Sequence, residues 1–333
     1  MDRVCFLKNL TAVSRGSASA DLVIKNSKIV DLFNGRIVKS DVAVYNDTIA
    51  GIGSYKGKKT IDAKGCYLLP GLIDGHIHLE STMLSPLEFT KLCLSNGTTA
   101  VVIDPHEIAN VAGIAGIKYI LNATENLPLD FYIMAPSCVP ASNLETYGHK
   151  ISGSDIRKLL KSNRVIGLAE VMDFPDVVNG KKAILKKIAA AEDRMIDGHA
   201  PLLSGKELSA YIAAGPSSDH EATNINEGNE KLSIGMQLMI REGSIAKDLK
   251  NLILLVNKYS LSNISFVSDD LLPTELIRDG HVNRILRKAV SLGLDPIMAI
   301  RMATLNTARY FNLKRVGSVA PGYKADMVLV KDL

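Results

Sequence analysis

The feature that most constrains this chain is residues 70–80, where an apolar stretch runs into two histidines separated by one residue. Successive side chains of a β-strand point to opposite faces, so His76 and His78 would share one face of a strand. Two imidazoles fixed in this way can bind one Zn, Fe, Mn or Ni ion from one side. His-x-His also occurs by chance in turns, so a metal site is indicated only if other residues of the chain support it.

Composition sets broad limits on the protein. Its 333 residues are 47% hydrophobic, enough for one large core, and the net charge of +4 is interspersed, which argues against a nucleic-acid partner. The four cysteines form no C-x-x-C pair, a pattern typical of reduced thiols in a cytoplasmic protein. The N-terminus is a poor signal peptide, and no window approaches the ~18 apolar residues of a membrane span. We therefore expect a cytoplasmic protein without a membrane segment.

Strand-like and helix-like segments alternate through the middle of the chain. The candidate strands end at Glu80, Asp104, Pro136, Glu170, His199, His220, Arg241 and Asp269. The candidate helices between them include residues 86–96, 156–162, 181–193, 206–214 and 227–233. Repeated βα units indicate a parallel sheet, and about eight of them in ~250 residues suit a (β/α)8 TIM-like barrel, an α/β fold.

The two ends of the chain have a different sequence pattern. Short β-rich runs broken by turn residues fill residues 21–52, and residues 316–333 repeat this pattern. We expect a small flanking β-sandwich built from both chain ends, preceded by a short helix and a linker. The expected domains are residues 1–20 as an N-terminal tail, residues 21–66 plus 313–333 as the sandwich, and residues 67–312 as the barrel.

Acidic and imidazole side chains close several of the candidate strands. In a (β/α)8 barrel the chemistry lies at the carboxyl ends of the strands, so these side chains would converge on one rim. Four histidines and two carboxylates are enough for two metal ions bridged by a carboxylate and a water. The residues in question are His76, His78, Glu170, His199, His220 and Asp269. His106 and His281 either contact substrate or supply a proton, or else cap local structure.

These motifs resemble the amidohydrolase superfamily and, within it, the adenine deaminases of the bacterial and archaeal type, over residues 21–333. His-x-His is shared across the superfamily, whereas Asp-Pro-His-Glu at residues 104–107 and Ile-Arg-Glu-Gly at residues 240–243 are more specific to the adenine deaminases. Further matching stretches are residues 136–141, 170–172, 197–201 and 218–221. The resemblance implies hydrolysis of adenine, a small purine base, to hypoxanthine and ammonia, and it suggests a homodimer.

The resemblance also implies a ligand set. Two divalent ions are expected, with Mn²⁺ favoured and Fe²⁺ or Zn²⁺ compatible with the same donors. One ion would be held by His76, His78 and Asp269, and the other by His199 and His220, with Glu170 as the bridge.

Catalytic roles follow from the same hypothesis. Asp269 would accept the proton of the metal-activated water and pass it to the departing amine. A ring nitrogen must also gain a proton, for which His281, His106 and Glu107 are open alternatives. His106, Glu107 and Arg241 are the expected substrate-binding residues.

The chain departs from the family pattern in two places. Family members usually continue into a further carboxyl-terminal domain, so the chain is expected to be a short form or a segment of a longer protein. In addition, Asn283 stands where the family commonly has an aspartate.

Four alternatives to an adenine deaminase make different predictions for these residues. Dihydroorotase-like and hydantoinase-like cyclic amidases often bridge their metals with a carboxylated lysine from the fourth strand, where this chain has Glu170. N-acetylglucosamine-6-phosphate deacetylase relatives take a carboxylate from the third strand, which here ends in Ala-Pro-Ser at residues 135–137. The H-x-E and P-C-x-x-C signature of nucleic-acid base deaminases is absent. A scaffold that has lost its chemistry predicts missing ligands, yet all six are present, so an enzyme is favoured.

Overall fold

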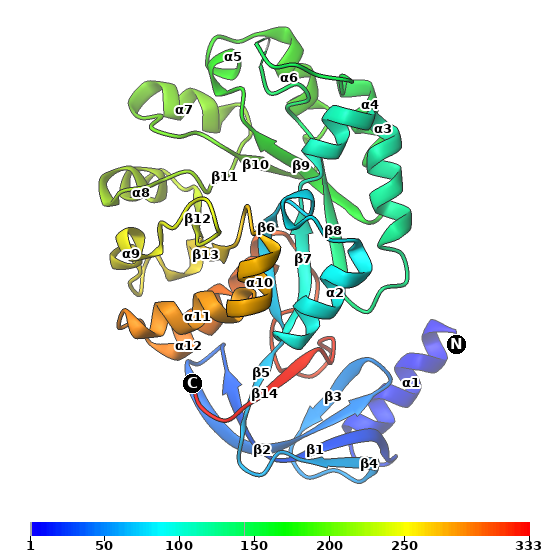
Figure 1. Cartoon of the computed structure of the whole chain (residues 1–333). Helices are drawn as coiled ribbons and strands as arrows, with labels where there is room; N and C mark the ends of the chain where they lie inside the picture. Colours follow the sequence, from blue (N-terminus) through cyan, green and yellow to red (C-terminus); the bar gives the residue numbers. More distant parts are fainter. Residues whose placement is uncertain (1, 143) are drawn as a thin grey trace. The chain divides into compact units, whose positions relative to one another are not determined.

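The computed structural model describes residues 2–142 and 144–333. The chain divides into two compact units, one made of Met1–Leu72 with Leu294–Leu333 and the other of Ile73–Gly293. Figure 1 shows the elements of each unit in chain order. Among the described residues, no helix combines the length and the apolar content needed to cross a membrane.

The unit Ile73–Gly293 is built on curled parallel sheets, which gives it a TIM-like α/β fold. One sheet has five strands in the order β10-β9-β8-β7-β6, and the other has three in the order β11-β12-β13. Ile77 forms a parallel bridge with Asp269, which brings the ends of β6 and β13 together. The strands are β6 (Leu72–Ile77), β7 (Thr98–Ile103), β8 (Asp130–Ala135), β9 (Val165–Val171), β10 (Met195–Gly198), β11 (Ser218–Asp219), β12 (Gln237–Arg241) and β13 (Ile264–Val267).

These strands end close to the positions expected from the sequence, and their burial explains the agreement. Every residue of β6, β12 and β13 is buried. Parallel strands covered on both faces read as continuous apolar runs, which makes them easy to recognise. Ile77, Ile103, Ile133 and Leu168 belong to one buried apolar cluster. The polar residues of these segments therefore stand out at the strand ends.

Helices alternate with these strands, and their starts follow local capping chemistry. Ser85 accepts a hydrogen bond from the Glu88 backbone N–H at 3.3 Å, and a Ser152–Asp155 capping box starts α4 three residues earlier than expected. The longer helices are α2 (Pro86–Ser95), α3 (His106–Ala123), α4 (Gly153–Leu159), α6 (Lys182–Ala189), α7 (Gly205–Ala213), α8 (Ile225–Ser233), α10 (Pro273–Asp279) and α11 (Val282–Ser291). Shorter turns are α5 (Phe174–Val178), α9 (Leu249–Leu252), η1 (Glu80–Thr82), η2 (Ile253–Leu255) and η3 (Leu261–Asn263).

The other unit contains one six-stranded sheet drawn from both ends of the chain. The antiparallel hairpins expected in residues 21–52 are present, and β14 pairs with β5. Ile29, Val42, Ile49 and Leu68 belong to one of its buried apolar clusters. Its elements are α1 (Arg3–Ser14), β1 (Ala20–Asp31), β2 (Arg36–Tyr45), β3 (Thr48–Ile52), β4 (Gly57–Asp62), β5 (Tyr67–Pro70), α12 (Pro296–Met302), α13 (Leu305–Tyr310) and β14 (Met327–Val330). A second sandwich layer and the domain limits expected from the sequence stay predictions.

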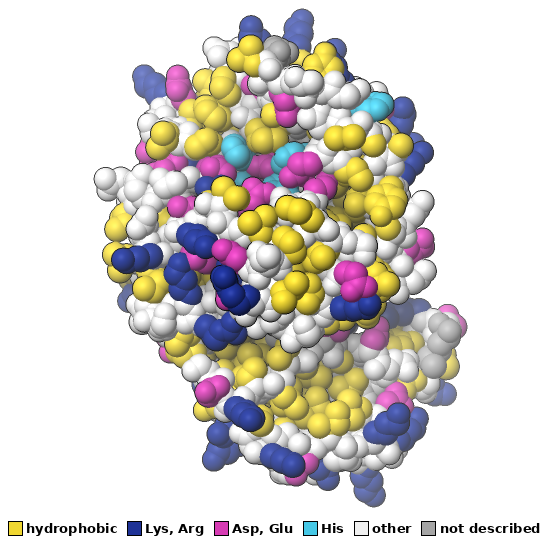
Figure 2. All heavy atoms as spheres, in the orientation of Figure 1, with side chains coloured by type: hydrophobic (Ala, Val, Ile, Leu, Met, Phe, Trp, Pro, Cys, Tyr) yellow, Lys and Arg dark blue, Asp and Glu magenta, His cyan; other side chains and the backbone are white. Residues whose placement is uncertain are grey.

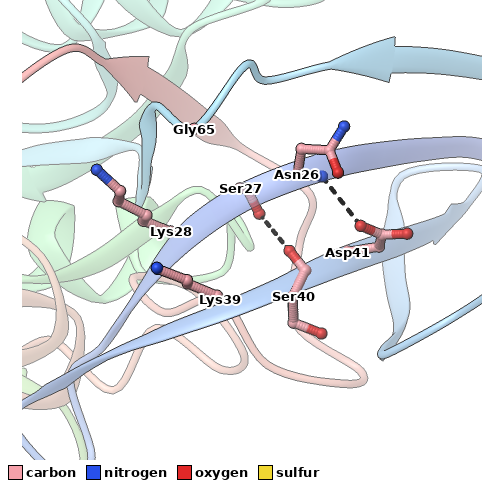
Figure 3. A pocket seen from close by; sticks show the side chains of 7 residues that line it. All are labelled: Asn26, Ser27, Lys28, Lys39, Ser40, Asp41 and Gly65. Atoms are coloured by element: carbon pink, nitrogen blue, oxygen red, sulfur yellow. Dashed lines mark hydrogen bonds between the residues drawn. The ribbon is translucent and has the colours of Figure 1, made fainter.

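A cavity of about 420 Å³ lies at the β-bulge between β1 and β2 (Figure 3). The Ser27 hydroxyl donates a hydrogen bond to the Ser40 carbonyl at 2.7 Å, and the Asn26 backbone N–H donates to Asp41 Oδ1 at 3.0 Å. Lys28 and Lys39 also line this cavity. It contains none of the metal-ligand candidates, so the chemistry has to be sought in the other unit.

Candidate metal centre

The six residues expected to bind metal lie together at the carboxyl ends of the parallel strands. His76 belongs to β6 and Glu170 to β9, while the other four lie just beyond the ends of their strands. Figure 2 shows histidine and acidic side chains gathered on one face of the molecule. Five of the six are buried, and His199 is partly exposed. The strand-end argument therefore identified residues that meet in space.

His76, His78 and Asp269 form the first group of potential ligand atoms. The Nε2 atoms of the two histidines are 3.2 Å apart, and Asp269 Oδ1 lies 3.1 Å from His78 Nε2 and 3.6 Å from His76 Nε2. An ion with ligand distances of about 2.0–2.2 Å would hold its ligand atoms at separations of this order. Imidazole nitrogens and a carboxylate are also donors that a divalent transition metal accepts. Spacing and chemistry both fit a cation here.

Glu170 lies between the two pairs of histidines. Its Oε1 atom is 3.5 Å from His78 Nε2 and 4.0 Å from His76 Nε2. Its Oε2 atom is 2.5 Å from His199 Nδ1 and 3.2 Å from His220 Nε2. Because each carboxylate oxygen faces a different histidine pair, Glu170 has the arrangement that a bridging ligand needs.

Glu221 is a member of the second group that sequence reasoning missed. Its Oε1 atom lies 3.6 Å from His199 Nδ1 and 3.6 Å from His220 Nε2, and the three residues form a potential ligand set. Strand alternation would aim Glu221 away from its neighbour His220. Since β11 ends at Asp219, both side chains lie beyond the strand and alternation does not apply.

His106 and Glu107, expected to contact substrate, begin α3 at the edge of the same cluster. His106 Nδ1 lies 3.1 Å from Asp104 Oδ2 and 3.4 Å from Glu170 Oε1. Glu107 Oε2 lies 3.7 Å from His78 Nδ1. Asp104, which the sequence did not single out, completes a potential ligand group with His78, His106 and Glu170. Both expected residues are therefore close enough to act on a molecule bound at this centre.

Arg241, the third expected substrate-binding residue, contacts acidic side chains of the centre. Its guanidinium forms ion pairs with Glu221, with Asp269 Oδ2 at 3.1 Å and with Asp248 Oδ2 at 3.4 Å. The side chain is only 10% exposed. Arg241 therefore holds Asp269, a candidate metal ligand, in place. A direct contact of Arg241 with substrate stays a prediction.

His281, expected as a catalytic residue, is not brought into the ligand cluster. Its Nδ1 atom lies 3.0 Å from Thr98 Oγ1, and its Nε2 atom lies 2.9 Å from Asp74 Oδ2. Among the described residues, its polar side-chain contacts are these two, and it packs edge-on against Phe89. Asn283, the departure from the family pattern, accepts a hydrogen bond from the His281 backbone N–H at 2.9 Å. These contacts favour a supporting role for His281.

The backbone geometry at the strand ends sets the positions of the candidate ligands Asp269 and His199. Asp269 has a φ of 57°, in the left-handed region that is uncommon for residues other than glycine, and its N–H donates to the His76 carbonyl at 2.9 Å. Gly198, just before His199, lies so close to β11 that a Cβ there would be 2.1 Å from the Ser218 carbonyl oxygen. Only glycine allows this approach of the two backbones.

The charges of the cluster shift its pKa values in opposite directions. Burial lowers the pKa of His76 well below its ordinary value, and the nearby His220 and His78 act in the same direction. Although burial alone would raise it, the contacts with His199 and His220 hold the pKa of Glu170 well below its usual range. Burial also opposes charge on His220, yet Glu170 raises its pKa to about 9. A cation bound here would compete with protons for the imidazole nitrogens, because a histidine binds metal only in its neutral form.

Comparison with known proteins identifies relatives of this chain. The model of the amidohydrolase family matches residues 67–332. An adenine deaminase of Kosmotoga olearia is 48% identical over 329 residues, covering 98% of this chain and 57% of the relative. An adenine deaminase 2 of Carboxydothermus hydrogenoformans is 49% identical over 327 residues, with the same two coverages. The chain thus spans somewhat more than half the length of these curated relatives.

Solved structures share the fold at low sequence identity. A crystal structure of an adenine deaminase superimposes with a TM-score of 0.62 at 18% identity, covering 93% of this chain and 90% of that chain. The L-hydantoinase of Arthrobacter aurescens gives a TM-score of 0.63 at 15% identity, covering 93% of this chain and 86% of that chain. Enzymes with different substrates therefore resemble this chain equally well in fold.

Proposed function

The chain belongs to the amidohydrolase family, and on this premise we propose that it catalyses the hydrolytic deamination of adenine to hypoxanthine and ammonia. The observation that carries the proposal is Glu170, whose two carboxylate oxygens face separate histidine pairs. The preference for adenine is drawn from curated relatives about 48% identical over 98% of the chain. Because those relatives are longer, the activity of this chain is a proposal that experiment must test.

Two divalent ions would complete the centre. We assign His76, His78 and Asp269 to one ion and His199 and His220 to the other, with Glu170 as the bridge. When bound, such ions act as Lewis acids and lower the pKa of a water molecule toward neutrality. The donor set accepts Mn²⁺, Fe²⁺ and Zn²⁺, and the family resemblance favours Mn²⁺.

The side chains around the centre supply the proton transfers. In the reaction a water oxygen bonds to C6 of adenine, the bond from C6 to the amino nitrogen breaks, and ammonia leaves. Asp269 would accept the proton that the water loses and return it to the departing nitrogen. Arg241 holds the other carboxylate oxygen of Asp269 at 3.1 Å, which leaves Oδ1 toward the histidines. His106 or Glu107, which lie against the cluster, would protonate a ring nitrogen and regain that proton from the second O–H bond of the attacking water.

An ammonia-release assay on metal-reconstituted protein tests the proposal. Adenine, adenosine, cytosine, guanine and dihydroorotate are compared at equal concentration, and hypoxanthine is identified by its ultraviolet spectrum. We expect ammonia and hypoxanthine in equal amounts from adenine, and no release from the other compounds. Hydrolysis of dihydroorotate opens its ring without releasing ammonia, so that product is followed by chromatography. Ring opening of dihydroorotate in place of adenine turnover would assign the chain to the cyclic amidases. No turnover of any compound by protein holding two ions would overturn the deaminase assignment.

Finer features of the protein belong to the same proposal. The Ile77–Asp269 bridge supports closure of β6 to β13 into one (β/α)8 barrel. The flanking β-sandwich, the homodimer and the cytoplasmic location remain predictions from the sequence. A purine base is the small-molecule partner that the proposed reaction requires.

A further inference from the structure

Lys231, in α8, is a completely buried lysine whose ammonium group has a full set of acceptors. Its Nζ atom donates to the Ala200 carbonyl, to Asp219 Oδ2 and to Glu227 Oε1, each at 2.8 Å. A lysine ammonium carries three N–H donors, so all of them are used. Burial of a charged group is costly unless it is paired and hydrogen-bonded, as this one is.

The first of these contacts reaches the residue that follows His199. Ala200 offers its carbonyl to Lys231, and its N–H donates to Asp219 Oδ1 at 2.9 Å. The N–H of His199 itself donates to the Tyr211 hydroxyl at 2.9 Å. The backbone that carries the His199 imidazole is therefore fixed on both sides, and one side depends on the ion pair between Lys231 and Asp219.

The second contact reaches the residues on either side of His220. Asp219 precedes it, and Asp219 Oδ2 accepts hydrogen bonds from Lys231 and from the N–H groups of Glu221 and Ala222, at 3.0 and 2.9 Å. Glu227, the other acidic partner, accepts from the Leu202 N–H at 2.8 Å. One buried ammonium thus links the segments that carry His199 and His220.

The strands that carry these two histidines offer little support of their own. β11 has two residues, and β10 has four with an irregular register against β9. Strands this short form few ladder hydrogen bonds, so their ends need support from side chains. By contrast, β6, which carries His76, has six residues, and Asp269 N–H bonds directly to its backbone.

We propose that Lys231 is a positioning residue for the second metal ion. Through Asp219 and Ala200 it fixes the backbone on which His199 and His220 stand, while the first ion's ligands lie outside its reach. The inference rests on the proposed two-ion function and adds a residue that is not itself a ligand. Its consequence is selective, since loss of Lys231 should weaken the ion held by His199 and His220 and spare the ion held by His76, His78 and Asp269.

Calorimetric titration of the metal-free chain with Zn²⁺ alone measures this selectivity. His78→Ala and His199→Ala assign the two binding steps to the two ions. In Lys231→Met we expect the second-ion affinity to fall about 10–100-fold, as is usual for residues that orient metal ligands, with the first-ion affinity unchanged. Glu227→Gln should lower the second-ion affinity by a smaller factor. Lys206→Met, at an exposed lysine of α7, is the matched control and should bind both ions normally.

The possible outcomes separate this proposal from the proposed function. A wild-type chain that binds fewer than two ions overturns the two-ion centre itself. If the wild type binds two ions and Lys231→Met binds both with unchanged affinity, the positioning role is wrong. An equal loss of affinity for both ions, together with a lower melting temperature, also overturns the positioning role, because that result indicates general destabilisation. If Lys231→Met does not fold, Glu227→Gln is judged by the same criteria.

Discussion

The Nε2 atom of His281 lies 2.9 Å from Oδ2 of Asp74, and both side chains are fully buried. Asp74 stands two residues before His76 and accepts hydrogen bonds from the N–H and the hydroxyl of Ser268, at 3.1 and 2.5 Å. Ser268 in turn precedes Asp269. The contact between His281 and Asp74 therefore lies behind the two strand ends that carry the proposed ligands of the first ion.

The first prediction concerns His281. In His281→Gln we expect the free energy of unfolding to fall by about 1–3 kcal/mol, because the buried Asp74 carboxylate loses a partner. Urea denaturation measures this change, with His149→Gln, at an exposed histidine, as the control. A loss of about 10²–10⁴ in kcat with unchanged stability would contradict the supporting role and restore His281 as a general acid.

The second prediction separates the two roles open to Arg241. Because its guanidinium pairs with Asp269 and Glu221, Arg241→Met should lower kcat for adenine about 10–100-fold and leave KM nearly unchanged. Steady-state kinetics measures the split, and Arg278→Met, at an exposed arginine, is the control. A rise in KM at constant kcat would show instead that Arg241 binds substrate.

The third prediction concerns the proposed base. Asp269→Asn keeps a ligand oxygen but cannot accept a proton, so kcat should fall by about 10² or more while both ions stay bound. Ammonia release gives kcat, and elemental analysis of the same sample gives the metal content. Near-normal turnover in this variant would refute the assignment of the base.

The fourth prediction concerns the bridge. Glu170→Gln removes the charge that lies between the two histidine pairs, so the variant should retain fewer than two ions after dialysis against a weak chelator. Elemental analysis measures the metal content, and Glu192→Gln, at an exposed glutamate, should retain two. Two ions held at wild-type affinity in Glu170→Gln would argue against bridging.

The fifth prediction concerns the reactivity of the buried cysteine thiols. Burial raises the pKa of the Cys138 thiol, and it raises that of Cys93 well above the ordinary value. Since only the thiolate reacts, both should resist iodoacetamide at pH 8, where exposed Cys5 is alkylated. Mass spectrometry follows each site over time, and urea-unfolded protein should react at all four cysteines. Equally fast reaction of Cys138 and Cys5 in folded protein would contradict this prediction.

The meeting of these six side chains in space was predictable because two simple rules act together. Apolar runs mark the buried parallel strands, and the carboxyl ends of such strands meet at one edge. His76 and Glu170 are ordinary residues in isolation, and their shared position after apolar runs is what indicated a centre. The hairpins in residues 21–52 followed in the same way from alternation and turn residues.

Other parts of the site depend on contacts that no local pattern contains. Glu227 and Lys231 are spaced four apart on a helix, a pattern that usually indicates a solvent-exposed pair. In the folded chain Lys231 is buried because Asp219 and Ala200 come to it from other segments. For His281 the sequence leaves a catalytic and a capping role open, and its partner Asp74 is 207 positions earlier in the sequence.

The pairing of β14 with β5 has a consequence for the newly made chain. β5 is joined on one side to β1, but its other neighbour, Met327–Val330, is translated only after the whole of Ile73–Gly293. At about 5–20 residues per second, the ribosome leaves that edge unpaired for tens of seconds. An open strand edge is a template for association with other chains. On a polysome, neighbouring nascent molecules are therefore exposed to association through this edge until β14 is made.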